Sequence, residues 1–190
     1  VGNSLEVREA IAVLSGDAER STDLKELTLE LTTEMLVLSG LSESHPHGLR
    51  LAQQALDSGK ALERLGELIE AQGGNPRIID NIGLLPQSPH TTVVTAPYEG
   101  WVACIDARLI GDATVALGAG RTQRSDSLDP AAGIELHAKC GQWVSHDEPW
   151  ATLYHGPGAD LGRATMKLKA ALSISPDKPA AIHLVKERRP

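Results

Sequence analysis

The 190-residue chain has few cysteines, few basic residues and no long apolar run, and each shortage argues against a class of protein. Its two cysteines, Cys104 and Cys140, have no CxxC spacing and no histidine at ligand spacing, so they indicate neither a zinc site nor a disulfide framework. We expect both to be small buried apolar residues. The net charge of −7 leaves no basic surface to follow a phosphate backbone, which argues against nucleic acid as a partner.

The apolar runs are too short to cross a bilayer, and the chain does not open with the basic, apolar and small-residue series of a secretory signal. These features predict a soluble, cytoplasmic protein without a membrane partner. The first residue is Val rather than Met, and the opening sequence is typical of the inside of a helical hairpin. We therefore expect a fragment of a longer protein, long enough to bury a core of its own.

Residues 1–74 carry four helical patterns in succession. The first runs from Asn3, which can cap with Glu6, to Leu14. The second begins near Asp23 and ends at Gly40, and its apolar stripe consists of Leu24, Leu27, Leu31, Met35 and Leu38. Pro46 is placed to start a third helix, and Ser58 to cap a fourth that ends at Gly73-Gly74.

Residues 75–90 contain three prolines and little periodicity, which predicts a surface connection between two units. Beyond it, β-branched or alternating residues predict strands at 91–95, 101–105, 133–138 and 150–154, with a helix over 107–117. Ala164, Leu168, Ala171 and Leu172 predict a further helix, and Ile182, Leu184 and Lys186 a final edge strand.

Two half-motifs, at 96–102 and 139–150, each pair a turn with apolar residues at strand spacing, as strands that double back across a small barrel require. This pattern suggests a carrier module. Thr165-Met166-Lys167-Leu168 is similar to the Met-Lys-Met tripeptide that carries biotin or lipoate, but a carrier lysine occupies a hairpin tip, whereas Lys167 falls in a helical pattern and is expected to be solvated. Lys139 precedes its glycine turn and is no better placed.

The run Gly118-Ala119-Gly120-Arg121 offers glycines and an arginine that could bind phosphate. It comes at the end of a helix, where glycine ordinarily serves as a left-handed cap, so we favour a structural role with Arg121 paired to Asp126 or Asp129.

Histidines and glutamates give no clear metal site from sequence alone. His45 and His47 flank a proline, and a metal needs more ligands than these two, so we expect a surface cap. Glu6 and Glu9 lie on the helix face opposite the apolar positions, which indicates solvation. No Ser/His/Asp or Cys/His catalytic set is recognisable.

Five segments in this order resemble the C-terminal part of a thymidine or pyrimidine-nucleoside phosphorylase: residues 1–11, Glu34-Met35-Leu36, the turn at 96–100, the run at 118–121 and residues 126–129. The resemblance covers essentially the whole chain. The first run and the 118–129 run are specific to that family, whereas the half-barrel motifs are shared more widely. Ser4 in place of the usual Ala, and His146-Asp147 in place of a glycine turn, are departures that affect surface geometry.

The resemblance implies an α+β fold. Residues 1–74 would be helices of the phosphorylase α/β domain, residues 75–90 a connection, and residues 91–190 the C-terminal hammerhead-like (barrel-sandwich) subdomain with a crossing helix, closed by a C-terminal helix and strand. A non-catalytic biotinyl- or lipoyl-like binding or carrier module is the alternative.

The resemblance also implies an activity: reversible phosphorolysis of thymidine or related pyrimidine nucleosides to free base and (deoxy)ribose 1-phosphate, by a cytoplasmic homodimeric pentosyltransferase of nucleoside salvage. Inorganic phosphate would be the co-substrate, without an organic cofactor. The family's phosphate loop and base-binding residues precede its Gly-Asn-x-x-Glu run, so we expect no catalytic or substrate-binding residue here and an inactive fragment. The resemblance also implies a potassium-like cation, held by upstream carbonyl groups and by the second glutamate of Glu-x-x-Glu, which here is Glu9; without those upstream ligands we do not expect this fragment to hold the ion.

Overall fold

The computed structural model describes residues 1–17, 21–121, 123–181 and 184–185. These residues divide into two compact units, one containing residues 1–7, 85–121 and 123–181 and the other containing residues 8–17, 21–84 and 184–185. The division between Leu84 and Leu85 falls inside the segment that the sequence indicated as a connection. The first seven residues, however, group with the residues after Leu84, and together these form what we call the β-rich unit. They do not group with the helices that directly follow them.

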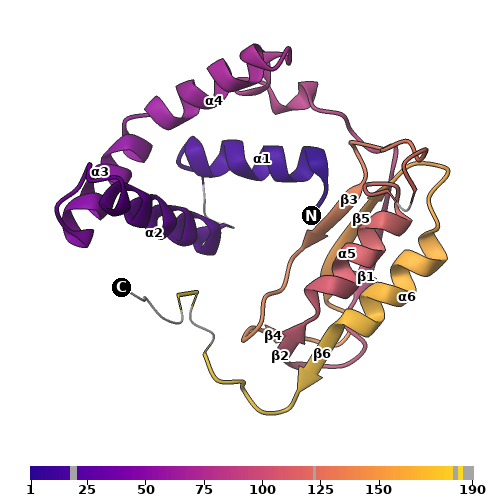
Figure 1. The fold of residues 1–190 in the computed structure, drawn as a ribbon. Helices are drawn as coiled ribbons and strands as arrows, with labels where there is room; N and C mark the ends of the chain where they lie inside the picture. The colour runs from indigo at the N-terminus through magenta and orange to yellow at the C-terminus, as the bar shows by residue number, and fades with distance from the viewer. Residues whose placement is uncertain (18–20, 122, 182–183, 186–190) are drawn as a thin grey trace. The chain divides into compact units, whose positions relative to one another are not determined.

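The second unit is helical (Figure 1). It begins inside α1, at Arg8, because the first residues of that helix group with the other unit. The elements are α1 (Asn3–Leu14), α2 (Thr22–Leu38), α3 (His45–Asp57), α4 (Lys60–Ala71) and two short 3₁₀ helices, η1 (Pro76–Ile78) and η2 (Ile82–Leu84). The four helical patterns of the sequence are confirmed, and the two 3₁₀ turns show that the connection is not without structure.

Two predicted helix caps are wrong. Asn3 does not pair with Glu6 as the cap of α1, because Asn3 is the first helical residue and Glu6 Oε1 accepts a hydrogen bond from the Gly2 amide at 3.4 Å. Ser58 does not cap α4 but ends α3, where its amide donates to the Gln54 carbonyl at 3.0 Å. Gly59 occupies the capping position of α4 with a φ of +76°. Because only two residues separate the helices, the chain needs the left-handed conformation that glycine adopts without steric cost.

The apolar stripe of α2 does not face its neighbouring helix. Thr33 is fully buried, and a Cβ added to Gly48 of α3 would lie 3.2 Å from the Thr33 Cγ2, so α3 packs closely against that side of α2. On the opposite side, Leu31, Met35 and Leu38 are 56%, 61% and 86% exposed. The stripe identified the helix correctly, yet within the described chain it remains on the surface.

The β-rich unit contains two three-stranded antiparallel sheets. One has the order β1-β5-β3 and the other β4-β2-β6; their strands are β1 (His90–Thr95), β2 (Gly100–Ile105), β3 (Gly133–Leu136), β4 (Trp143–Val144), β5 (Pro149–His155) and β6 (Leu172–Ser175). The two half-motifs pair directly, with Trp101 opposite Trp143, as expected for strands that double back. The α+β fold class is thereby confirmed.

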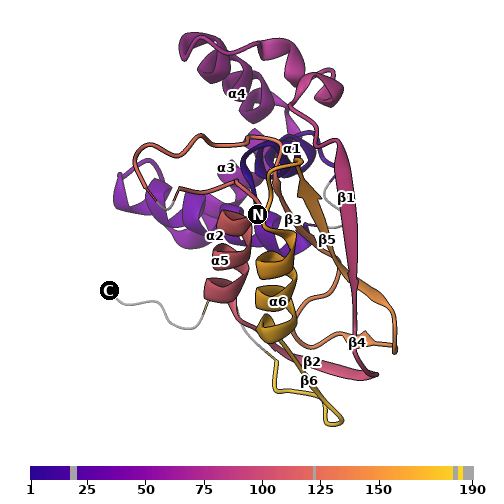
Figure 2. The same cartoon turned by 90° about the vertical axis from the view of Figure 1, so that its right-hand side faces the viewer.

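Two helices pack against these sheets and close the core. In Figures 1 and 2, α5 (Ala107–Ala116) and α6 (Leu161–Ala171) lie side by side. Their buried faces join the inner residues of the strands in one cluster, whose largest fully buried side chains are Trp150, Leu117, Ile134, Leu153, Leu168, Val102 and Val144. This core belongs to the β-rich unit alone and gives it a hydrophobic interior of its own.

The expectation that both cysteines are buried is wrong for Cys104, which is exposed on β2. Alternation would place Cys104 on the inner face with Val102, but the pairing of β2 with β6 shifts register between these residues. The bulge turns Cys104 outward, and Ile105 packs against the core instead. Cys140 is half-buried against the same core.

The end of the chain differs from prediction in one respect. Leu172, predicted as the last apolar position of a helix, is the first residue of β6 and pairs with Ile105. The edge strand predicted from Ile182, Leu184 and Lys186 falls mostly outside the described residues.

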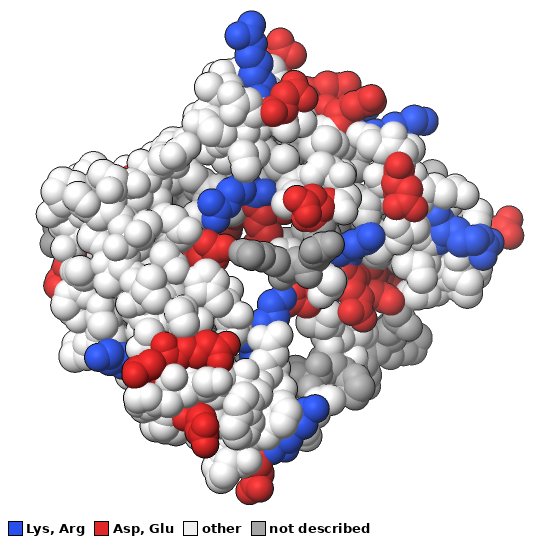
Figure 3. Space-filling view, turned by 180° about the vertical axis from the view of Figure 1, so that it is seen from behind, with Lys and Arg blue, Asp and Glu red and all other residues white. Residues whose placement is uncertain are grey.

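Across the described residues, no helix combines the length and apolar character that spanning a membrane requires. On the face drawn in Figure 3, Lys and Arg are scattered among Asp, Glu and uncharged residues and form no continuous basic surface.

Candidate functional site

The opening run and the 118–129 run, which carry the family-specific resemblance, converge on one segment at residues 129–134. The Ser4 amide donates to the Pro130 carbonyl at 3.0 Å, and the Asp129 amide donates to the Gly118 carbonyl at 2.9 Å. Val1 and Ile134 exchange two backbone hydrogen bonds of 2.7 Å, the pattern of a hydrogen-bonded antiparallel pair. Sequence segments far apart thus build one hydrogen-bonded junction in the β-rich unit.

Gly118 serves as a helix cap rather than as a phosphate cradle. It follows α5 with a φ of +96°, its amide donates to the Val115 carbonyl, and the Ala119 amide donates to the Thr114 carbonyl. These two bonds are the Schellman pattern that closes helices. Because both amides are used within the helix end, they are not directed at an anion, which favours the structural interpretation.

The expected partners of Arg121 have backbone roles. Asp126 accepts a hydrogen bond from the Gln123 amide at 2.8 Å, and Asp129 Oδ1 accepts one from the Ala131 amide at 2.9 Å. The pairing of Arg121 with either carboxylate stays a prediction.

Glu9, the predicted cation ligand, lies on α1 with its side chain exposed. The Ser21 hydroxyl donates to Glu9 Oε1 at 2.6 Å, so a carboxylate and a hydroxyl oxygen lie side by side. Oxygen atoms are the donors that hard cations prefer, but such ions take about six or more of them. The Glu9 and Ser21 oxygens therefore fit the chemistry of a cation site only as part of a larger donor set.

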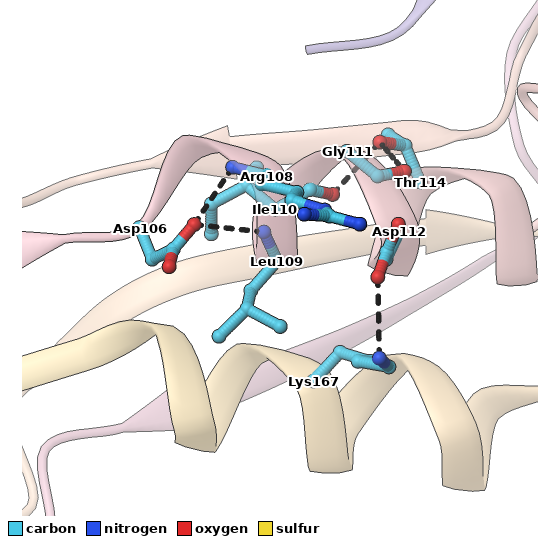
Figure 4. Close-up of polar contacts among 8 residues, drawn as sticks. All are labelled: Asp106, Arg108, Leu109, Ile110, Gly111, Asp112, Thr114 and Lys167. Carbon is cyan, nitrogen blue, oxygen red and sulfur yellow. Dashed lines mark hydrogen bonds and ion pairs between the residues drawn. The ribbon is translucent and has the colours of Figure 1, made fainter.

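Neither candidate carrier lysine lies at a hairpin tip. Lys167 is within α6, and its Nζ lies 3.1 Å from Asp112 Oδ2 of α5, with the two side chains 29% and 43% exposed (Figure 4). It is a half-buried ion-pair partner, which corrects the prediction of a simply solvated residue. The Lys139 amide donates to Gln142 Oε1 at 2.8 Å, ahead of the turn at Gly141, as the sequence indicated.

His45 has neighbours that the sequence interpretation missed. Glu30 and Glu34 of α2 approach its ring, whereas only His47 had been considered as a second ligand. The available signal was the spacing of the two glutamates, one helical turn apart on a helix that a short loop connects to His45.

Known proteins of the family that the sequence motifs resemble are similar to this chain. The Pyrimidine nucleoside phosphorylase C-terminal domain family matches residues 101–175. The chain is 35% identical over 187 residues, 97% of its length, to a pyrimidine-nucleoside phosphorylase of Staphylococcus aureus strain bovine RF122 / ET3-1. It is 39% identical over 154 residues, 81% of its length, to the Bacillus subtilis pyrimidine-nucleoside phosphorylase.

Residues 101–175 belong to the pyrimidine nucleoside phosphorylase C-terminal domain family, and the chain is similar to pyrimidine-nucleoside phosphorylases over most of its length. The matched residues 101–175 begin in β2 and end with β6, so the family's C-terminal domain coincides with most of the β-rich unit. The chain spans 42% of the length of the Staphylococcus aureus relative and 35% of that of the Bacillus subtilis relative.

Proposed function

We propose that this chain is the C-terminal part of an enzyme that catalyses the reversible phosphorolysis of thymidine and related pyrimidine nucleosides. In this reaction an oxygen of inorganic phosphate bonds to the anomeric carbon while the glycosidic carbon–nitrogen bond breaks. The base leaves with the bonding electrons and takes up a proton, and the sugar leaves as (deoxy)ribose 1-phosphate. The observation that carries the proposal is 35% identity over 97% of the chain to a protein named for this class of activity.

In this proposal the chain is a support for chemistry that occurs elsewhere in the polypeptide. Phosphorolysis depends on positioning two reactants and on stabilising the charge that develops on phosphate and base. The residues that the resemblance implies for those tasks belong to the polypeptide before the opening run. The junction at 129–134 would hold that run in place, and residues 1–190 alone would be inactive.

The exposed stripe of α2 supports a larger assembly for the helical unit. Leu31, Met35 and Leu38 lie on one face and are each more than half exposed. A contiguous apolar surface of this kind marks an interaction site. Because the chain spans less than half of its relatives, we propose that the preceding part of the same polypeptide covers this face, as helices of an α/β domain would require.

Glu9 belongs to the proposal as one ligand of a potassium ion. The Ser21 hydroxyl, which donates to Glu9 at 2.6 Å, orients the carboxylate, and the remaining oxygen ligands would come from backbone carbonyl groups that precede Val1. The ion would supply a fixed positive charge where the opening run joins that polypeptide. A cytoplasmic homodimer acting in nucleoside salvage completes the proposal.

The reaction class is tested with the complete polypeptide that carries this chain. Thymidine and uridine are supplied with and without inorganic phosphate, and free base and sugar phosphate are separated by chromatography. We expect base release only with phosphate, in equal amounts with pentose 1-phosphate. Base release without phosphate, yielding free sugar, would identify a hydrolase, and release from neither nucleoside would remove the proposed activity.

A further inference from the structure

A histidine and two glutamates lie together where α2 and α3 pack. His45 is the first residue of α3, and Glu30 and Glu34 are one turn apart on α2. One ligand atom from each of the three side chains lies within 4.8 Å of the other two. The group shares no residue with the pair formed by Glu9 and Ser21.

The helical hairpin holds these side chains in place. The Ser42 amide donates to the Leu36 carbonyl at 3.0 Å, and the buried Ser42 hydroxyl donates to the Ser44 carbonyl at 2.9 Å, which fixes the loop between the helices. The first turn of α3 also meets α2 closely, because a Cβ added to Gly48 would lie only 3.2 Å from the Thr33 side chain. The approach of His45 to α2 therefore follows from the backbone as well as from attraction between side chains.

The distances suit a small tetrahedral ion. His45 Nε2 lies 3.0 Å from Glu30 Oε2 and 3.7 Å from Glu34 Oε1. Zinc bonds of about 2.0–2.1 Å in a tetrahedron place neighbouring ligand atoms roughly 3.3–3.4 Å apart. The two observed separations lie on either side of that value, so shifts of a few tenths of an ångström would bring both His45 distances to it, with the Glu30 and Glu34 ligand atoms already within 4.8 Å of each other.

The surroundings favour a cation and leave room for water. Two carboxylates at i and i+4 repel each other, and a cation between them removes that repulsion. Glu34 Oε1 is shielded from solvent, whereas the side chains of Glu30, Glu34 and His45 are 23%, 40% and 29% exposed as a whole. Three protein ligands with partial exposure leave a fourth position for a water molecule.

We propose that Glu30, Glu34 and His45 bind one Zn²⁺ ion that joins α2 to α3. An imidazole with two carboxylates is a donor set typical of zinc and similar transition metals, whereas magnesium and calcium prefer oxygen ligands alone. The ion has a structural role here: it holds the start of α3 against α2. The site does not depend on the proposed phosphorolysis.

The competing interpretation is a plain ion pair, in which a protonated His45 bonds to Glu30 and Glu34 with no metal. Metal binding and imidazole protonation exclude each other, since the ligand is the neutral ring. Binding is therefore measured at slightly alkaline pH with residues 1–190, by calorimetric titration with Zn²⁺ and by the visible absorption of bound Co²⁺.

His45→Gln, Glu30→Gln and Glu34→Gln remove one ligand each, and His47→Gln is the matched control, because it alters a histidine two residues away that is outside the group. We expect one equivalent of Zn²⁺ to bind, a Co²⁺ absorption typical of four-coordination, and a loss of affinity of about tenfold or more in each ligand variant. The control should bind as the unaltered chain does. Circular dichroism of each metal-free variant checks that its helices are intact. If one ligand variant unfolds, the test rests on the other two.

Three results would overturn the proposal. The first is that the unaltered chain does not bind Zn²⁺, and the second is that the ligand variants bind it as tightly as the unaltered chain does. The third is that His47→Gln loses as much affinity as the ligand variants. Displacement of Zn²⁺ by an equal concentration of Mg²⁺ would also contradict the donor argument.

Discussion

Gly2 and Gly133 meet backbone to backbone, and neither position has room for a side chain. A Cβ on Gly133 would lie 3.0 Å from the Gly2 Cα and 2.5 Å from the Val1 carbonyl oxygen. Gly2 also has a φ of +131°, which residues with side chains rarely adopt. The opening run is thus held to β3 by a close backbone approach as well as by hydrogen bonds.

Gly133→Ala should lower the free energy of unfolding by about 1–3 kcal/mol, because the added methyl group forces the opening run away from β3. Gly111→Ala is the control. Gly111 lies within α5 with open space around it, and alanine there should raise the free energy of unfolding by about 0.5–1 kcal/mol. Urea denaturation of both variants measures the difference. Equal stability of Gly133→Ala and the unaltered chain would show that the close approach does not constrain the fold.

Asp147 has a positive φ, +61°, in the turn where the resemblance implies a glycine. The left-handed conformation costs residues with a Cβ roughly 1–2 kcal/mol, and aspartate reduces that cost through local hydrogen bonds. Asp147→Gly should therefore be at least as stable as the unaltered chain, and about 1–2 kcal/mol more stable than Asp147→Ala. Thermal unfolding of the three proteins tests this order. A more stable alanine variant would contradict the turn geometry.

Neither Lys139 nor Lys167 should be modified by a biotin or lipoyl ligase. Lys167 lies within α6 and forms an ion pair with Asp112 of α5, whereas such enzymes require a lysine exposed at a hairpin tip. Intact-mass measurement after co-expression with each ligase should show the unmodified chain, with a known carrier domain as positive control. A mass gain on either lysine would support the carrier alternative.

The stripe on α2 should matter only in the complete polypeptide. Leu38 is 86% exposed, so Leu38→Gln should change the stability of residues 1–190 by less than about 0.5 kcal/mol. In the complete polypeptide the same change should cost about 1.5–3 kcal/mol, the value of a buried leucine. Leu168→Ala, in the core of the β-rich unit, is the control and should cost about 2–5 kcal/mol in both proteins. Equal effects of Leu38→Gln in the two proteins would show that this face stays exposed.

Local signals in the sequence predicted most elements, because caps and periodicity act within a few residues. The pattern from Asn3 to Leu14 defines α1 to the residue, and the helix pattern at 107–117 ends one residue beyond α5. The predictions were wrong where a residue far away in the sequence determines the local structure. Leu172 fits the helical spacing of α6 but pairs with Ile105 in a sheet.

The candidate sites were harder to predict from the sequence, because contacts between distant residues also determine them. The register shift that turns Cys104 outward depends on β6, some seventy residues later in the chain. His45 was judged by its neighbour His47, whereas its close contacts are Glu30 and Glu34 on the preceding helix. The proposed role of Glu9 as a cation ligand rests on the resemblance alone, since its local sequence pattern indicates only a solvated glutamate.

The central proposal is that the residues that make and break the glycosidic bond lie outside this chain, and that this chain is a structural support for them. Its most direct test is phosphate-dependent thymine release from thymidine by purified residues 1–190, compared with an equal amount of the complete polypeptide. The account predicts release by the complete polypeptide and none above the enzyme-free background by residues 1–190. Thymine release by residues 1–190 alone would contradict it.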